Sequence, residues 1–526
     1  MHRIKTATIA LGVLLAFLPG LRSQPVVAAG NTFSVKQYGA TGKRAQNATK
    51  AIQDAIDAGT AAGGGVVYVP PGDYTTGAIH LKDNVNLHLE AGATFFLSQN
   101  PADFAGRARA MINSNGARNI AVTGRGTLDG LAQYEYVDMR NRDTEIDAER
   151  EIARLAGVPI KRYYRTGMQT YMFVLNDSTD VRLENITVIN SPLWNVRLNQ
   201  CDRVFIRGVH IYSDLEKGVN SDGIDIVSSS NVLISDSIIV TADDAIVIKT
   251  EGRGGPAKPV ENVTVTNCIL TSSSTPMMIG TETQADIRHI VFGNSVIRDS
   301  NKAFGINVQD GATVSDVIFT NITMDSRRRH WNWWGDAETF KFILKKRTPE
   351  SKLGVIRDIV IDNVISHARG TSTLTGHAER RLENITISNL RMFMDAENMP
   401  DQRTTDAIRA DGVNGLNIRN VSVKWAEDIT QQNWRSALYL KEVTGLEVDN
   451  FTGRQGLKTS KAPVVVLENV NDGVLRNLWA TEGSATFLEF RGARTKDLWV
   501  HSNQLKKAAQ PAAFTGGAQR LLITLQ

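Results

Sequence analysis

Three features of the sequence predict an all-β fold, a single-stranded right-handed parallel β-helix with a capping helix near its N-terminus. Short segments that alternate Val or Ile with a polar residue recur from residue 118 almost to the C-terminus. Asn residues recur between these segments, where the chain has to turn a corner. One amphipathic helical segment precedes the repeats. Together these features are typical of a solenoid, in which each repeat forms one coil.

The N-terminal segment predicts export. Residues 1–29 run from a basic start through an apolar stretch to small residues at Ala28 and Ala29, which is the layout of a secretory signal peptide. The apolar stretch is shorter than the roughly 18 residues that a membrane anchor needs, and Pro19 interrupts it. We therefore expect a cleaved signal peptide, a secreted or periplasmic protein without a membrane span, and one β-helix domain over residues 30–526.

Residues 47–62 predict the capping helix. The apolar residues of this segment share one helical face, and three consecutive glycines from Gly63 then end the helix. A helix here would shield the unpaired strand edge that the first coil of a solenoid exposes. The apolar segments of residues 63–96 predict the first coils, and residues 503–526 are expected to finish the other end. The residues on the apolar helical face are Ala48, Ala51, Ile52, Ala55 and Ile56.

The spacing of the repeats is the main argument for the solenoid. Aligned on the first apolar residue of each unit, successive repeats are 23, 28, 31, 27 and 27 residues apart. A β-sandwich or a propeller also has many short strands, but a sandwich needs tight two-residue hairpin turns, and Asn-Gly and Gly-Gly turns are nearly absent between the repeats. A propeller needs a longer regular period. The aligned residues are Val181, Val204, Val232, Val263, Ile290 and Val317.

Charge and cysteine content say little about the ligand. The net charge of +4 is compatible with a polyanionic ligand but too small to identify one. Cys201 and Cys268 are 67 residues apart, which puts them roughly 14 Å apart along a solenoid that rises about 4.8 Å per coil. We therefore expect two small buried hydrophobes rather than a disulfide, and no metal site around either cysteine.

Four aspartates lie beside segments that have the pattern of buried strands. Asp222 and the pair Asp243-Asp244 are about one coil apart, so a β-helix would stack them. Stacked carboxylates raise one another's pKa, which suits acid and base catalysis of glycoside hydrolysis. The same residues could also cap corners or bind calcium, and spacing alone leaves both interpretations open. Asp225 fits a structural corner group, or a residue that supports its catalytic neighbours, better than a catalytic residue.

The blocks "NSDGID" (220–225) and "ADDAIVIKT" (242–250) resemble the N-T-D-G-I-D and G-D-D-C/A-I-A-I-K motifs of polygalacturonase-type glycoside hydrolases, the pectin-degrading enzymes of family 28. The similarity extends to "YGATGKRAQNATKAIQDAID", "VTGRGTLDG" and "SPLWNVRLNQC", and covers most of residues 36–325. Each block is moderately specific, whereas their common order and spacing are strong. The resemblance implies a β-helical hydrolase that acts on a pectic or related polysaccharide.

Carried over to this chain, the resemblance implies that Asp243 is the general acid and that Asp222 and Asp244 activate the attacking water, with inversion at the anomeric carbon. Asn220 would line the same cleft. Inverting glycosidases hold their carboxyl groups about 6.5–9.5 Å apart, whereas adjacent coils are about 4.8 Å apart. Splayed side chains would have to supply the difference. Lys249, which ends the second block, is expected to lie near the pair and help to keep a carboxylate ionised.

The chain departs from the family pattern at two places. Thr275 stands where the family carries a His beside the general acid, and Gly305 and Asn307 stand where an R-I-K motif supplies two cations for the substrate carboxylate. Either the sugar at that subsite is neutral, or a cation comes from elsewhere in the cleft.

A basic and aromatic segment at residues 325–342 is the predicted source of such a cation. Arg328 could pair with an acidic group, and Trp333 and Trp334 could stack on sugar faces, although packing of the segment against the coil is an equal alternative. Glu282 is a further candidate cleft residue. The predicted substrate-binding set is Asn220, Lys249, Glu282, Arg328, Trp333 and Trp334.

Two other functional classes remain open at the level of sequence. A polysaccharide lyase shares this solenoid form but needs a basic residue and commonly calcium, and a non-catalytic carbohydrate-binding β-helix would need no reactive aspartates. We expect no cofactor and no metal, a polysaccharide as the partner, a monomer, and no nucleic acid binding, because the glycine-rich stretches lack the strand-then-helix context of phosphate-binding motifs.

Overall fold

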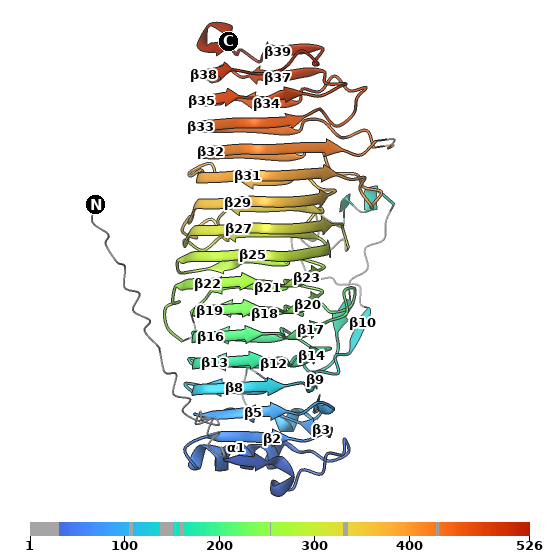
Figure 1. Ribbon diagram of the computed structural model, residues 1–526, viewed down its shortest axis with the longest axis vertical. Coiled ribbons are helices and arrows are strands. Elements are labelled where there is room, and N and C mark those ends of the chain that lie inside the picture. Colours follow the sequence, from blue (N-terminus) through green and yellow to red (C-terminus); the bar gives the residue numbers. More distant parts are fainter. Residues whose placement is uncertain are drawn as a thin grey trace, which may run out of the picture.

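The computed structural model describes residues 31–104, 109–136, 151–152, 154–157, 163–252, 254–329, 335–427, 429 and 431–525. Within these residues the chain winds into an elongated solenoid whose coils stack along one axis (Figure 1). One sheet system of 38 strands, all paired in parallel, confirms the predicted right-handed parallel β-helix. The predicted signal peptide, residues 1–29, lies outside the described residues.

Each coil contributes strands to three faces of the solenoid. The first face contains the strands that follow the aspartates, and its strands pair in register from one coil to the next. It consists of β4 (Ile79–His80), β7 (Ala110–Asn115), β12 (Tyr171–Asn176), β15 (Val196–Asn199), β18 (Ile224–Val227), β21 (Ile246–Thr250), β24 (Met277–Thr283), β26 (Lys302–Val308), β28 (Glu338–Leu344), β30 (Ser372–Thr375), the starts of β32 (Ile408–Trp425) and β33 (Leu438–Gly453), β34 (Val465–Glu468), β37 (Thr486–Arg491) and β39 (Gln510–Thr515).

The second face holds the alternating Val and Ile segments from which the repeat was recognised, and it is the longest series of parallel pairs. It consists of β1 (Thr32–Ser34), β2 (Gly65–Val69), β5 (Val85–Leu89), β8 (Arg118–Gly124), β13 (Thr179–Glu184), β16 (Asp202–Arg207), β19 (Ser230–Ser235), β22 (Val260–Thr266), β25 (Ile287–Ser300), β27 (Thr313–Ser326), β29 (Val355–Ala368), β31 (Leu382–Met394), the middle of β32 and β33, β35 (Asn471–Arg476), β38 (Lys496–His501) and β40 (Ile523–Leu525).

The third face is formed by shorter strands and by the far ends of the long strands from β25 to β33, which bend across the corner. Its separate strands are β3 (Gly72–Thr76), β6 (Ala93–Leu97), β9 (Thr127–Asp129), β14 (Thr187–Ile189), β17 (His210–Tyr212), β20 (Ile238–Thr241), β23 (Ile269–Ser272) and β36 (Trp479–Ala480).

The interior is filled by side chains that stack from coil to coil. Phe319 lies with its ring centroid 5.3 Å from that of Phe292 and 4.6 Å from that of Phe304, and Phe342 continues the stack at 5.9 Å. All four rings are fully buried. Cys201 and Cys268 are buried as separate thiols, as predicted, and burial raises the pKa of each thiol to about 11.

The recurring Asn residues are explained by backbone geometry at the corners. Asn231, Asn262 and Asn321 have φ values of 56°, 59° and 54°, which lie in the left-handed region that Asn tolerates better than most residues. Their side chains also bond along the axis: Asn262 Nδ2 donates to Asn231 Oδ1 at 2.9 Å. One residue type therefore serves both the turn and the stacking of coils.

The N-terminal end is covered as the sequence predicts. Helix α1 spans Thr49–Ala61 and buries Ala51, Ile52, Ala55 and Ile56, and it lies across the end of the solenoid beneath β2 (Figure 1). Other short elements are η1 (Val35–Tyr38), η2 (Pro101–Asp103), the antiparallel pair β10 (Tyr134–Tyr136) and β11 (Tyr163–Arg165), and η3 (Arg520–Leu522) at the C-terminal end. In the described ranges, no helix has the length and apolar character to cross a membrane.

Candidate active site

Asp222 and Asp244 occupy the same position in successive coils. Each lies two residues before a strand of the first face, Asp222 before β18 and Asp244 before β21, and these strands pair with Ile224 opposite Ile246. The pairing extends back to the aspartates, because the amide of Gly223 donates to the carbonyl oxygen of Asp244 at 2.8 Å. Equal strand offsets in adjacent coils therefore stack two residues that are 22 positions apart in sequence.

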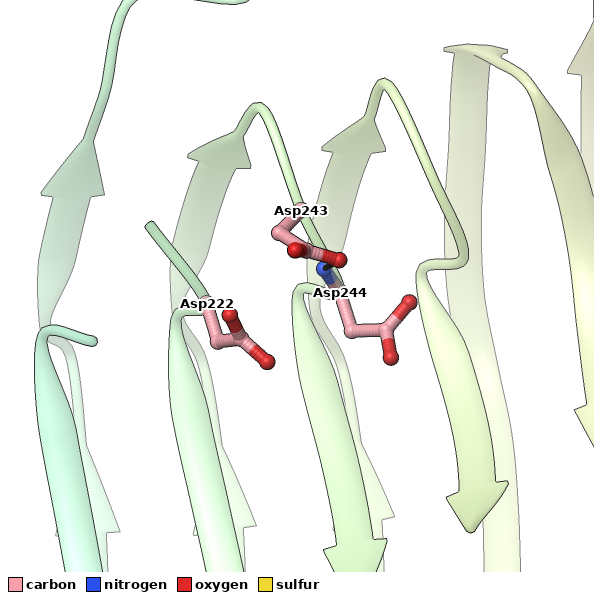
Figure 2. A group of neighbouring side chains, drawn as sticks. All are labelled: Asp222, Asp243 and Asp244. Carbon is pink, nitrogen blue, oxygen red and sulfur yellow. Dashed lines mark hydrogen bonds between the residues drawn. The ribbon is translucent and has the colours of Figure 1, made fainter. Parts of the chain in front are cut away.

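Asp243 completes a cluster of three carboxylates, which Figure 2 shows at the turns that lead into β18 and β21. One oxygen from each of the three carboxyl groups lies within 4.8 Å of the others. The residues are only 3%, 8% and 9% exposed for Asp222, Asp243 and Asp244. The three carboxyl groups therefore form one compact and nearly buried cluster.

The three carboxylates differ in their hydrogen bonds. Asp244 Oδ1 accepts from the hydroxyl of Ser274 at 2.8 Å and from the backbone amide of Thr275 at 3.1 Å. Asp243 Oδ1 accepts from the amide of Asp244 at 2.9 Å. Asp222 Oδ1 is buried without a hydrogen-bond partner in the described part of the chain. The Asp244 carboxyl group is therefore oriented by two donors from the next coil, whereas Asp222 Oδ1 has none.

Lys249 is the cation at the centre of the cluster. Its ammonium group lies 3.4 Å from Asp222 Oδ2, 3.0 Å from Asp225 Oδ1 and 3.9 Å from the ring centroid of Trp194. Burial would lower the pKa of Lys249, but Asp225 and Asp222 outweigh it and raise the pKa well above its usual value. Lys249 is buried as expected, but its ion pairs are with Asp222 and Asp225 rather than with the Asp243-Asp244 pair, and its role in keeping a carboxylate ionised stays a prediction.

Burial and mutual repulsion separate the pKa values of the aspartates. Burial raises the pKa of Asp222 to about 6, against the attraction of Lys249, and the charge of Asp244 adds to the rise. Burial, followed by the charges of Asp222 and Asp244, raises the pKa of Asp243 well above its usual range. Asp222 and Asp243 therefore both hold their protons to higher pH than an ordinary Asp does. The cluster thus offers an acid and a base side by side.

Three clustered carboxylates could also hold a cation, because oxygen atoms are the ligands that hard metal ions prefer. Within the described residues, Asp222, Asp243 and Asp244 are the acidic, His or Cys side chains whose ligand atoms lie close enough together to hold a metal ion. Lys249, at 3.4 Å from Asp222, already supplies a positive charge to the cluster. That the protein needs no metal ion stays a prediction.

The column that contains Asp222 and Asp244 continues along the solenoid. Met277 pairs with Ile246 in one direction and with Phe304 in the other, which places Thr275 and then Lys302 at the aspartate position of the next two coils. Lys302 lies opposite Glu338 in the coil after that. The sequence analysis missed Lys302, because its place in the column follows from the pairing of Phe304 with Met277 and Lys302 is itself the first residue of β26.

An aromatic and cationic group flanks the cluster on its N-terminal side, and the sequence analysis gave it no role. Tyr171 and Trp194 meet edge to face with ring centroids 5.8 Å apart, and Arg197 lies 5.1 Å from the Trp194 centroid. Arg197 also pairs with Glu251. All four side chains are partly exposed, so they are available to a ligand on this face.

The remaining predicted residues separate into near and distant ones. The side-chain amide of Asn220 points to Asp243 Oδ2 at 3.5 Å, at the limit of a hydrogen bond. Glu282 is partly exposed, accepts from the hydroxyl of Thr281 at 3.1 Å and lies 3.8 Å from Arg347. Its charge contributes to the raised pKa of Lys249. Both residues therefore belong to the surroundings of the cluster.

Arg328 has a different environment from the one we expected. It is 3% exposed, and its guanidinium makes a two-pronged ion pair with Asp401 at 2.7 and 3.1 Å. Arg329 pairs with Asp299. These contacts fasten the segment to neighbouring coils, so the structure supports a packing role for Arg328 rather than substrate binding. Trp333 and Trp334 lie outside the described residues.

Comparisons with known proteins agree with the fold and with the carboxylate cluster. The model of the family described as glycosyl hydrolases family 28 matches residues 65–391, a range that contains all three aspartates. The chain belongs to glycosyl hydrolases family 28. It is therefore a glycosyl hydrolase, and the resemblance found in the sequence blocks is confirmed.

Relatives of this family 28 hydrolase are about 25% identical to it over the aligned residues. A probable polygalacturonase of Vitis vinifera is 25% identical over 413 residues, which cover 72% of this chain and 78% of the relative. The exo-poly-alpha-D-galacturonosidase of Dickeya chrysanthemi is 25% identical over 336 residues, or 55% of this chain and 54% of that protein. The match thus spans about half of the Dickeya protein.

Solved structures confirm the fold of this hydrolase. The exopolygalacturonase of Thermotoga maritima superposes with a TM-score of 0.60 at 21% identity, over 75% of this chain and 92% of that one. The family 28 exopolygalacturonase of Yersinia enterocolitica gives a TM-score of 0.58 at 19% identity, over 80% and 79% of the two chains.

Proposed function

We propose that this hydrolase is an exported enzyme that cleaves glycosidic bonds of a pectic polysaccharide with inversion at the anomeric carbon. The observation that carries the proposal is the buried cluster of Asp222, Asp243 and Asp244, in which one oxygen of each carboxyl group lies within 4.8 Å of the others. The pectic substrate is supported by its relatives, which are described as acting on galacturonan.

The chemistry assigns one role to each carboxylate. Asp243 donates its proton to the glycosidic oxygen as the bond between that oxygen and the anomeric carbon breaks. Asp222 and Asp244 accept the proton of a water molecule whose oxygen forms the new bond from the opposite side of the sugar. A subsequent proton exchange with solvent restores Asp243. Lys249 acts through Asp222, since its ammonium group holds that carboxylate ionised.

The test is hydrolysis in water enriched in heavy oxygen. Purified mature protein is incubated separately with polygalacturonate, rhamnogalacturonan and neutral pectic side chains, and products are followed by mass spectrometry and by NMR of the anomeric proton. We expect one heavy oxygen per new reducing end and an initial product of inverted configuration. The Asp243→Asn variant is the control for contaminating activity.

Other outcomes would identify the competing classes. A product with an ultraviolet-absorbing double bond and no heavy oxygen would show a lyase, and addition of a chelator would then abolish its formation. Heavy-oxygen product with retained configuration would sustain hydrolysis and refute inversion. No product from any of the three substrates would contradict the proposed activity.

Export has its own measurement. The mature protein recovered outside the cytoplasm of its own cell type is expected to begin at Gly30, after the small residues Ala28 and Ala29. Edman sequencing or intact mass gives this directly. A mature chain that keeps residues 1–29 would refute the signal peptide.

A further inference from the structure

A run of hydroxyl residues lies beside the aspartate pair in the next coil. Residues 271–275 read Thr-Ser-Ser-Ser-Thr and form the end of β23 and the start of the turn into β24, just as Asp243 and Asp244 lie in the turn from β20 into β21. Ile246 pairs with Met277, which brings the two turns together. All five side chains of this hydroxyl run are buried. Their hydroxyl groups therefore have to find partners within the protein or in the site itself.

The hydroxyl of Ser274 holds one oxygen of Asp244. It donates to Asp244 Oδ1 at 2.8 Å, and the backbone amide of Thr275 donates to the same oxygen at 3.1 Å. Ser274 is 3% exposed, so little solvent competes for this bond. Because both donors reach Oδ1, the other oxygen, Oδ2, is left for a water molecule or a substrate.

The same run also fastens the backbone of the pair. Ser272 Oγ donates to the carbonyl oxygen of Asp243 at 2.7 Å and accepts from the amide of Ser274 at 2.8 Å. Thr241 Oγ1 donates to the same carbonyl oxygen at 2.7 Å. Two hydroxyl groups thus share the Asp243 carbonyl, whereas Ser274 supplies the side-chain bond to the carboxyl group of Asp244.

The side chain of Thr275 has a different environment, although Thr275 stands where the family pattern has a His. Its hydroxyl is buried without a hydrogen-bond partner in the described part of the chain. Its contact with Asp244 is made by the backbone amide, which every residue except proline supplies. In this turn, the hydrogen bond to the aspartates that depends on the residue type therefore comes from Ser274, one position before the place of the His.

We propose that Ser274 is a positioning residue for hydrolysis. Its hydroxyl fixes the orientation of the Asp244 carboxyl group through Oδ1, so that Oδ2 is directed to the attacking water. The hydroxyl keeps its proton, and no bond to Ser274 forms or breaks. Orientation matters because a misplacement of about 1 Å lowers a rate by up to about 100-fold. The inference rests on the proposed function, because it concerns the step in which Asp244 assists the water.

The first experiment separates kcat from KM. The substrate is whichever of polygalacturonate, rhamnogalacturonan and neutral pectic side chains the wild-type protein hydrolyses. Ser274→Ala is expected to lower kcat about 10-fold while KM stays within about twofold, because the lost bond orients Asp244 and touches no sugar. Ser274→Thr keeps the hydroxyl and should retain most of kcat. Ser274→Cys has a similar size but is a weak donor, so it should resemble Ser274→Ala.

Ser295→Ala is the matched control. Ser295 is 4% exposed and donates to the carbonyl oxygen of Gly293 at 2.7 Å, within β25. Its replacement removes a buried serine bond of similar length away from the aspartates, and kcat should stay within about twofold of wild type. An equal loss of kcat in both alanine variants, or a raised KM with unchanged kcat in Ser274→Ala, overturns the inference. If thermal melting shows that Ser274→Ala does not fold, Ser274→Cys takes its place.

A crystallographic measurement is independent of turnover and separates this inference from the proposed function. Crystals of the wild-type protein are expected to show Asp244 in one conformation, and crystals of Ser274→Ala to show it rotated or in two conformations. An unchanged Asp244 in Ser274→Ala overturns the inference even if the wild-type protein hydrolyses a pectic substrate. A displaced Asp244 in that variant, with no hydrolysis by the wild-type protein, sustains the positioning contact and refutes the proposed function.

Discussion

The aspartates of the cluster differ in the charges that surround each carboxyl group. Asp222, Asp243 and Asp244 are the same residue type at nearly the same depth, yet their surroundings differ. Asp222 has Lys249 at 3.4 Å, whereas burial and the charges of Asp222 and Asp244 outweigh the attraction of Lys249 and raise the pKa of Asp243 well above its usual range. Roles in catalysis therefore follow from the neighbours of each residue rather than from its identity.

Replacing Asp243 by Asn should abolish activity and stabilise the fold. Loss of a general acid lowers kcat by about 10²- to 10⁴-fold, and the amide removes a buried group whose ionisation is unfavourable. The pKa of Asp243 is raised in the folded state, so its contribution favours folding at low pH and is lost as pH rises. The gain in melting temperature should therefore be larger at pH 8 than at pH 4. A lowered melting temperature at pH 8 would instead indicate a structural role.

The same separation of pKa values predicts a bell-shaped pH profile. Activity on the preferred substrate should rise as the cluster loses its first proton, with an apparent pKa near that of Asp222, about 6. It should fall at higher pH as Asp243 loses its proton. These apparent values belong to the coupled cluster. Initial rates of kcat/KM across pH 4 to 9 give the profile, and a rate that rises monotonically with pH would contradict the assignment of Asp243 as the acid.

At the scale of elements, the Asn residues at the corners both form the turn and join neighbouring coils. Asn321 at a left-handed corner donates its amide to Asn294 at 2.9 Å and accepts from Asn363 at 2.8 Å. The same arrangement recurs at Asn420, which links Asn389 and Asn450. Each such residue fixes the turn of its own coil and its register with two others.

Two substitutions at Asn321 separate these contributions. Asn321→Gly keeps the left-handed backbone but loses the two exposed hydrogen bonds, so it should cost about 1–2 kcal/mol of unfolding free energy. Asn321→Ala loses the bonds and also strains the corner, which adds about 1 kcal/mol or more. Chemical denaturation monitored by circular dichroism measures both. Equal stability of the two variants would show that the backbone conformation contributes nothing at this corner.

The strand offset, rather than the strand itself, assembles the active site. The residues two positions before Ile224, Ile246 and Phe304 come together although the intervening loops differ in length, because these strand residues pair in register from coil to coil. A change in one loop length would leave the column intact as long as that pairing holds. The residue type at this column position can therefore differ from coil to coil while the strand pairing is kept.

At the scale of the whole molecule, stability should be local along the solenoid. Each coil contacts chiefly its neighbours, so damage at one end need not reach the other. Helix α1 closes the N-terminal end with the fully buried Ile52, whereas β18 and β21, the strands that follow the aspartates, lie many coils away from it (Figure 1).

Ile52→Ala tests this independence. Loss of its buried methyl groups should destabilise the N-terminal end by about 2–5 kcal/mol. Amide hydrogen exchange is expected to accelerate in α1, β1 and β2 while β21 and β24 keep their protection and activity stays within about twofold of wild type. Leu488→Ala in β37 is the matched control, and it should affect the C-terminal coils instead. Uniform acceleration through all coils in either variant would refute local stability.

The sequence by itself determined the coil, its corners and its reactive residues. The repeat spacing, the corner Asn residues, the apolar face of residues 47–62 and the Asp243-Asp244 pair are local patterns, and strand period and turn preference are set by nearby residues. The sequence also identified the family, because the motifs occur in the order typical of the family although identity to its relatives is low.

Only the tertiary structure decided which distant side chains share a site. Lys302 is 27 residues from Thr275 and 58 from Asp244, in coils of unequal length, so its place in their column follows from backbone pairing rather than from a constant spacing. Arg328 meets Asp401 across 73 residues, which changed it from an expected substrate contact to a packing contact. Side-chain partners across coils depend on where each strand begins, and loop length hides that offset from the sequence.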